Sequence, residues 1–96
     1  MTSITDPLIQ ARPLEDLETS VLFDIAAEAA TALSGTYLWL ERHALTAQDV
    51  DRWRTQRRAV LARQRALLPV DRAGVATAIQ EWSEHRQYLK AAYQQG

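Results

Sequence analysis

The sequence contains no cysteine. This absence excludes a disulfide framework, a zinc site built on thiolates and a cysteine nucleophile. No stretch approaches the roughly 18 apolar residues of a membrane-spanning helix, so we expect no membrane association. Residues 1–13 lack the charged and then apolar layout of a signal peptide. We therefore expect a cytoplasmic protein of bacterial or phage origin.

An excess of charge of one sign is also missing, because 11 basic residues accompany 12 acidic ones. A nearly neutral chain has no general electrostatic attraction for nucleic acid. The charges are nevertheless segregated. Residues 14–35 hold acidic side chains and no basic one, whereas residues 52–65 hold six arginines and no acidic residue. This pattern leaves open ion pairing within the fold, solvated faces, an acidic protein surface and phosphate groups as partners of the arginines.

Motifs for catalysis or metal binding are absent from the sequence. His43 and His85 do not belong to a ligand pair spaced i, i+4. No serine lies in a nucleophile motif, and no glycine-rich loop is present to hold phosphate. Glu81 and Glu84 share one side of a predicted helix, where such pairs are commonly solvated. We therefore predict a non-enzymatic protein with no cofactor and no metal site.

Apolar residues recur at intervals of three and four along most of the chain, which predicts an all-α fold. The first helix is expected over about 13–44. Ser34 and Gly35 resemble a stop signal, but a glycine inside a helix costs only about 1 kcal/mol. The sequence thus predicts one long kinked helix, or two helices in nearly continuous phase. The expected apolar stripe consists of Leu14, Leu17, Val21, Ile25, Ala29 and Leu33, followed by Tyr37, Leu40 and Ala44.

Thr46 begins the second predicted helix, which extends to about Leu68. The Thr46 hydroxyl can cap the free N–H groups, and Asp49 can return a bond to the Thr46 backbone. Leu45 and Val50 have the spacing of a hydrophobic staple. The expected apolar side consists of Val50, Trp53, Val60, Leu61, Leu67 and Leu68.

Pro69 ends the second helix, and Asp71 caps a third. The third helix carries apolar residues at helical spacing, namely Val75, Ile79, Trp82, Leu89 and Tyr93. Connections as short as 44–46 and 69–71 imply antiparallel neighbours. We therefore predict a three-helix bundle, or a long kinked α-hairpin with a third helix packed on it. The bundle forms a single helical domain over 13–96, after a flexible N-terminal arm over 1–12.

Four bulky apolar residues follow one another from Tyr37 to Leu40. At about 100° per residue, Tyr37 and Leu40 continue the core stripe, whereas Leu38 and Trp39 point away from it. The third helix or the N-terminal arm can cover these two side chains. Alternatively, Trp39 is an anchor for another protein, since Trp, Tyr and Arg are enriched at the energetic centres of interfaces. Tyr37, Trp39 and Arg42 lie together here.

The segment LWLERHALTAQDVDRW, residues 38–53, resembles the early part of small helical antitoxins that inhibit Fic-type nucleotide transferases. In that family a helix carries a glutamate that obstructs the nucleotide site of the partner enzyme. The resemblance places Glu41 at the position of that glutamate, and Thr46 with Asp49 at the start of the next helix. The chain has Tyr37 where the family has Ser or Thr, and Arg42 where it has Gly or Asn. The resemblance implies a small helical protein that binds and restrains a larger partner.

We therefore predict a protein-binding module, an antitoxin or comparable inhibitor, that occludes a larger protein such as a toxin enzyme. The predicted contact residues are Tyr37, Leu38, Trp39, Glu41 and Arg42, and a secondary basic face consists of Arg52, Arg54, Arg58 and Arg65. Two alternatives stay open. One is a small nucleic-acid-binding regulator that uses the basic face. The other is a self-associating helical protein, whose Trp39 surface closes a homodimer.

Overall fold

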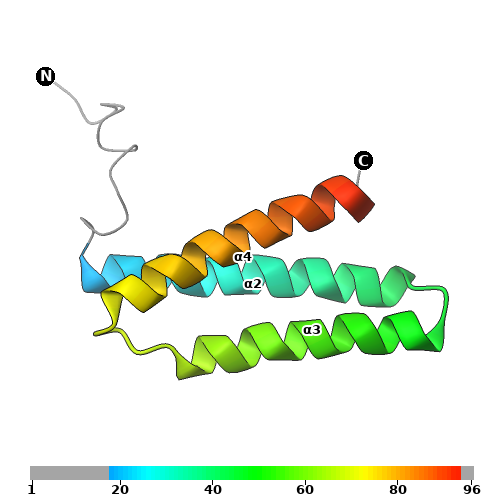
Figure 1. Cartoon of the computed structure of the whole chain (residues 1–96), viewed down its shortest axis with the longest axis horizontal. Helices are drawn as coiled ribbons and strands as arrows, with labels where there is room; N and C mark the ends of the chain where they lie inside the picture. The colour runs from blue at the N-terminus through cyan, green and yellow to red at the C-terminus, as the bar shows by residue number, and fades with distance from the viewer. Residues whose placement is uncertain (1–17, 94–96) are drawn as a thin grey trace, which may run out of the picture.

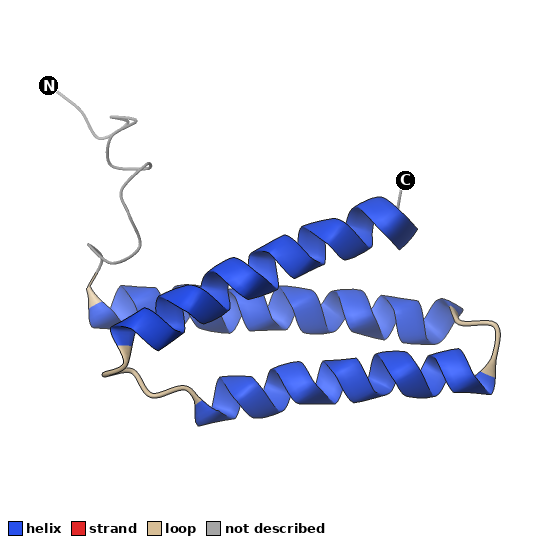
Figure 2. Ribbon diagram, viewed as in Figure 1, coloured by secondary structure: helices blue, strands red, loops and turns tan. Residues whose placement is uncertain are grey.

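The computed structural model describes residues 18–93, which form an all-α three-helix bundle (Figure 1). The helices are α2 (Thr19–His43), α3 (Ala47–Ala66) and α4 (Arg72–Tyr93). Figure 2 shows these helices joined by two short loops, and no strand occurs in the described part of the chain. The predicted fold class is confirmed. The expected arm over 1–12, and the first residues of the expected first helix, lie outside the described residues.

Helix α2 is the central element, because it packs extensively against both α3 and α4. The α3–α4 interface is smaller, and Figure 1 shows α4 moving away from α3 toward its C-terminal end. At the opposite end, Nη1 of Arg72 donates to Oγ1 of Thr19 at 2.8 Å, which joins the start of α4 to the start of α2. The three helices thus pack closely near the start of α2 and open toward its end.

Helix α2 differs from the prediction at its start, and it has no break at Ser34 and Gly35, where the sequence left a break open. Glu18 has an extended backbone, with ψ of 151°, so the described helix starts at Thr19 rather than near residue 13. The helix then continues through Ser34 and Gly35 to His43. The surrounding packing against two helices compensates for the modest cost of one glycine.

The buried side of α2 differs from the predicted stripe in its first half. The prediction placed Val21, Ile25 and Ala29 in the core, but Val21 is exposed and the other two are only partly buried. Steps of four residues advance about 40° beyond a full turn, so they drift around the helix. The observed stripe mixes steps of three and four and therefore keeps one direction. It consists of Leu22, Ala26, Ala30, Leu33, Tyr37 and Leu40.

Helix α3 starts as predicted. The Thr46 hydroxyl accepts a hydrogen bond from the Asp49 backbone N–H at 3.0 Å, which caps the helix. The Asp49 carboxylate lies 3.7 Å from the Arg52 guanidinium. The predicted hydrophobic staple is wrong, because Leu45 is 97% exposed and cannot pack on Val50. Leu45 projects instead from the loop between α2 and α3, where its whole side chain is available to solvent.

Helix α3 ends at Ala66, two residues before the predicted end. Pro69 disfavours helical geometry at the preceding residue, and Leu67 already has an extended backbone. Asp71 caps α4 as predicted, since its Oδ1 accepts from the Gly74 backbone N–H at 3.1 Å. The core of α3 is limited to Trp53 and Val60. The buried residues of α4 are Val75, Ala78, Ile79, Trp82 and Leu89.

Candidate functional site

Tyr37, the first of the predicted contact residues, belongs to the core. Its side chain is 1% exposed, and its ring lies 5.9 Å from that of Trp53. The hydroxyl lies 3.2 Å from Nε2 of His85, so the buried polar group has a partner. Burial raises the pKa of the Tyr37 phenol. Tyr37 therefore supports the surface around it and exposes very little area of its own.

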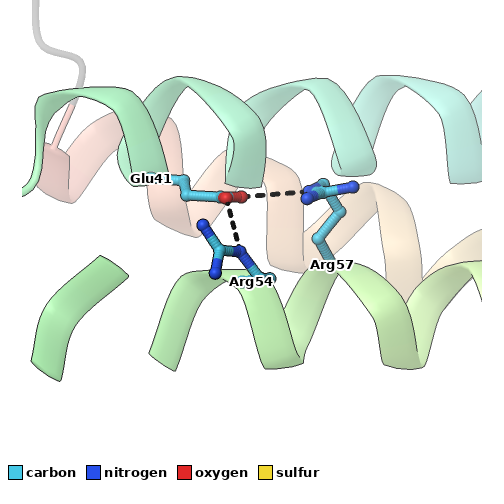
Figure 3. A network of polar contacts seen from close by, with 3 residues as sticks. All are labelled: Glu41, Arg54 and Arg57. Carbon is cyan, nitrogen blue, oxygen red and sulfur yellow. Dashed lines mark hydrogen bonds and ion pairs between the residues drawn. The ribbon is translucent and has the colours of Figure 1, made fainter. Parts of the chain in front are cut away.

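Glu41 is engaged within the bundle (Figure 3). Its side chain is 10% exposed, and its two carboxylate oxygens accept from different arginines of α3. Nε of Arg54 donates to Oε1 at 2.9 Å, and Nε of Arg57 donates to Oε2 at 3.1 Å. The Arg54 hydrogen bond has the largest effect and lowers the pKa of Glu41; Arg57 lowers it further, against the opposing effect of burial. This carboxylate ties α2 to α3, rather than pointing outward toward a partner.

Trp39 and Arg42 are the exposed members of the predicted contact set, while Leu38 is half-buried. Trp39 is 38% exposed and stacks on His43, with ring centroids 4.0 Å apart and planes tilted by 20°. Nδ1 of His43 lies 2.8 Å from the Trp39 carbonyl oxygen, so this nitrogen is the donor. Trp39 and His43 thus form a stacked aromatic pair at the C-terminal end of α2.

Of the four arginines in the predicted basic face, two contact other side chains and two form no ion pair with the described residues. Arg54 pairs with Glu41, and Arg52 lies over the Trp53 ring at 4.3 Å from its centroid. Arg58 and Arg65 are exposed and form no ion pair with the described residues. The arginines of α3 are therefore not a uniform row of free cations.

Aromatic side chains gather in two adjoining hollows where the α2–α3 loop meets the end of α4. The first hollow has a volume of about 290 Å³, and the second of about 200 Å³. We call the two together the aromatic groove. The first is lined mainly by Trp39, His43, Leu45, Arg52, Trp53 and Tyr93. The second is lined mainly by Tyr37, Arg52, Trp53, His85, Tyr88 and Tyr93. The groove thus takes in all three tyrosines, two of the three tryptophans and both histidines of the chain.

Edge-to-face ring contacts hold the walls of the aromatic groove. Trp53 and Tyr93 join α3 to α4, with ring centroids 5.4 Å apart and planes at 74°. His85 lies edge-on to Tyr37 at 5.8 Å, and it also contacts the ring of Tyr88 at 6.4 Å. Such pairs stabilise their arrangement beyond the burial of apolar area. These ring contacts therefore support the shape of the groove before a partner binds.

The sequence prediction missed this groove as a unit. It placed Trp53 and Tyr93 on core faces and considered His43 and His85 as candidate metal ligands. A pattern was available, since residues 37–53 and 82–93 contain every tyrosine and every tryptophan. Only the packing of α4 on α2 shows that these two segments meet.

No three His, Cys, Asp or Glu side chains within residues 18–93 lie close enough together to hold a metal ion. None of α2, α3 and α4 combines the length and apolar character needed to cross a membrane. Comparisons with protein families, curated proteins and solved structures found no match to this chain. The resemblance to Fic-inhibiting antitoxins therefore stays a hypothesis.

Proposed function

We propose that the chain is a small non-enzymatic protein-binding module that restrains a larger partner, as an antitoxin or comparable inhibitor does. The aromatic groove is its contact surface. The observation that carries this proposal is the concentration of Trp, Tyr and Arg side chains around an open hollow with the exposed Leu45 at its rim. These three residue types dominate the energetic centres of protein interfaces.

The energetics of the groove suit a protein partner. Leu45 is almost fully exposed in the free chain, and burying a leucine side chain stabilises a complex by about 1.5–3 kcal/mol. Trp39 and Tyr93 offer further apolar area on either side. Because their ring contacts already hold these side chains, binding orders fewer groups and loses less entropy. Restraint of the partner follows from occlusion of the surface that the groove covers.

The role of Glu41 in this proposal differs from the one that the resemblance implies. Its carboxylate is held by Arg54 and Arg57, so obstruction of a nucleotide site would require both ion pairs to break. Glu41 instead fixes α3 against the end of α2, and this places Trp53 beside Trp39 in the groove. The aromatic groove, rather than the carboxylate, is the group that meets the partner.

The nucleic-acid alternative has less support from the arrangement of the arginines. Two of its four residues, Arg52 and Arg54, already contact side chains of the same chain. The remaining pair, Arg58 and Arg65, are spaced seven residues apart on one helix. Two free cations make a small share of the phosphate contacts that a typical nucleic-acid site uses.

The test is recovery of the tagged full-length chain from its native host at modest salt, with Leu45→Ser and Leu68→Ser as a matched pair. Both leucines are exposed, and Leu68 lies at the opposite end of α3, at 62% exposure. We expect a stoichiometric protein companion with the wild type and with Leu68→Ser, and its loss with Leu45→Ser. Circular dichroism should show equal helix content in all three.

Other outcomes would contradict the proposal. A companion that Leu45→Ser retains would place the contact away from the groove. Recovery of nucleic acid without a protein companion would favour the arginines of α3. Recovery of further copies of the chain alone, in a manner sensitive to Leu45→Ser, would favour self-association.

A further inference from the structure

Helices α3 and α4 run antiparallel. An ion pair links them toward the end of the bundle where the three helices pack closely. Nη1 of Arg63 donates to Oε1 of Glu81 at 2.6 Å. The same guanidinium lies over the ring of Trp82, 5.4 Å from its centroid. Arg63 therefore has both an aromatic platform beneath it and a carboxylate supplied by the opposite helix.

Arg52, at the other end of α3, also lies over a tryptophan ring, but this ring belongs to Trp53 of the same helix, whereas Arg63 lies over Trp82 of α4. Arg52 precedes Arg63 by eleven residues, or about three helical turns, so the two arginines share one side of α3. Its guanidinium lies 4.3 Å from the centroid of the Trp53 ring. Arg52 lines both hollows of the aromatic groove, and no other arginine within residues 18–93 lines either of them.

A carboxylate from the opposite helix is missing at Arg52. Eleven residues beyond Glu81 the sequence of α4 has Ala92, so α4 carries no carboxylate at the spacing that matches Arg52. Among the described residues, Arg52 pairs with Asp49 of its own helix at 3.7 Å, which exceeds hydrogen-bond distance. Its side chain is also 55% exposed. An exposed pair of this length contributes little stability, so it can exchange for a better partner.

We propose that Arg52 supplies the specificity of the aromatic groove by binding the carboxylate of an acidic residue in a partner protein. This inference rests on the proposed function and names the chemistry of the bound segment. The segment carries an Asp or Glu beside a large apolar residue. The apolar side chain enters the first hollow between Trp39 and Tyr93, and the carboxylate takes the place that Glu81 occupies at Arg63.

The geometry of the guanidinium supports a carboxylate as the matching group. Arginine presents planar, forked N–H donors that fit two carboxylate oxygens, and such charged hydrogen bonds are stronger than neutral ones. The cation–π contact with Trp53, 4.3 Å from the guanidinium carbon to the ring centroid, favours this position of Arg52 before binding and so reduces the entropy lost in the complex. Asp49 also lines the first hollow and is the present acidic partner of Arg52, so the partner's carboxylate replaces Asp49 at the guanidinium.

The experiment is selection of a displayed library of random twelve-residue peptides against the immobilised full-length chain. Selected peptides are synthesised, and their dissociation constants are measured by fluorescence anisotropy. The protein variants are Arg52→Gln, Arg52→Lys, Arg58→Gln and Leu45→Ser. Arg58 is the matched control, because it is exposed on the same helix but does not line the groove.

We expect an Asp or Glu beside Leu, Phe or Trp in the selected peptides. Arg52→Gln should weaken binding about tenfold or more, since a hydrogen bond to a charged group is lost. Arg52→Lys should restore part of the affinity, because it keeps the charge without the fork. Arg58→Gln should change binding less than about twofold. Replacing the peptide carboxylate by its amide should weaken binding to the wild type but not to Arg52→Gln.

Two results would overturn the inference, and they can be told apart. Peptides that lack acidic residues, or that bind Arg52→Gln unchanged, yet lose binding to Leu45→Ser, would refute the role of Arg52 and leave the groove as a protein-binding surface. Peptides that bind Leu45→Ser as tightly as the wild type would refute the groove itself, and the proposed function with it.

Discussion

The buried hydroxyl of Tyr37 lies 3.2 Å from Nε2 of the exposed His85, and this contact links the core of α2 to the wall of the aromatic groove. A phenol buried without a partner would destabilise the fold. The contact with α4 supplies that partner and at the same time orients the imidazole ring. The core and the groove are therefore parts of one packed arrangement.

Removal of the hydroxyl and removal of the ring should differ in their effects. Tyr37→Phe keeps the ring and should lower the free energy of unfolding by about 1 kcal/mol. Tyr37→Ala empties a fully buried site and should lower it by about 3–5 kcal/mol. Urea denaturation followed by circular dichroism measures both. The control Tyr88→Phe alters an exposed tyrosine and should have almost no effect; equal losses at both tyrosines would contradict the assignment of Tyr37 to the core.

Substitution by alanine should destabilise the fold much less at Trp39 than at Trp82. Trp39 is partly exposed and stacked on His43, so Trp39→Ala should cost only about 1 kcal/mol of stability. Trp82 is buried, and Trp82→Ala should cost about 3–5 kcal/mol. Denaturant unfolding gives both values, and peptide or partner binding should be lost with Trp39→Ala while the fold persists. Unfolding of the free Trp39→Ala protein would show that Trp39 is a core residue.

The Glu41 ion pairs should make the stability depend on pH in a defined range. The pKa of Glu41 is lowered from the ordinary value of 4.5, first by the Arg54 hydrogen bond. A lowered folded-state pKa means that the contribution is fully present above 4.5 and is lost as the pH falls through the folded-state value. Wild type should therefore be more stable than Glu41→Gln at neutral pH.

The measurement compares urea unfolding of wild type and Glu41→Gln from pH 7 down to pH 3. The difference between the two free energies should be constant in the upper part of this range and should shrink below 4.5. Arg54→Gln should reduce the same pH dependence, because it removes the largest cause of the shift. A difference that stays constant across the whole range would show that the charge of Glu41 does not stabilise the fold.

Gly35 is a position where a larger residue should stabilise the protein. It lies inside α2, and a Cβ atom there would meet no other atom within 4 Å. Gly35→Ala should therefore raise the free energy of unfolding by about 0.5–1 kcal/mol. Gly74→Ala is the contrasting case, since its Cβ would displace the Asp71 carboxylate that caps α4. Thermal unfolding should show a gain only for Gly35→Ala, and a loss at Gly35 would contradict the open environment of this site.

Features that depend on near neighbours in sequence were predictable. The all-α class follows from the apolar period, and the start of α3 follows from the Thr46 cap. The start of α4 at Asp71 is set in the same way. The first half of the α2 stripe was wrong, because the apolar residues Val21 and Leu22 are adjacent and period alone could not choose between them. Packing into the shared core buries Leu22 and leaves Val21 exposed.

The sequence by itself thus determined the helices, their caps and the all-α class, since these depend on interactions within about four residues. The tertiary structure decided how each helix is rotated about its own axis and how α4 diverges from α3. Those choices placed Glu41 between Arg54 and Arg57, buried Tyr37 and left Arg52 without an acidic partner on α4. The physical reason is that interhelical packing involves residues far apart in the chain, and each helix rotates about its axis to the position that buries the most apolar area and pairs its buried charges.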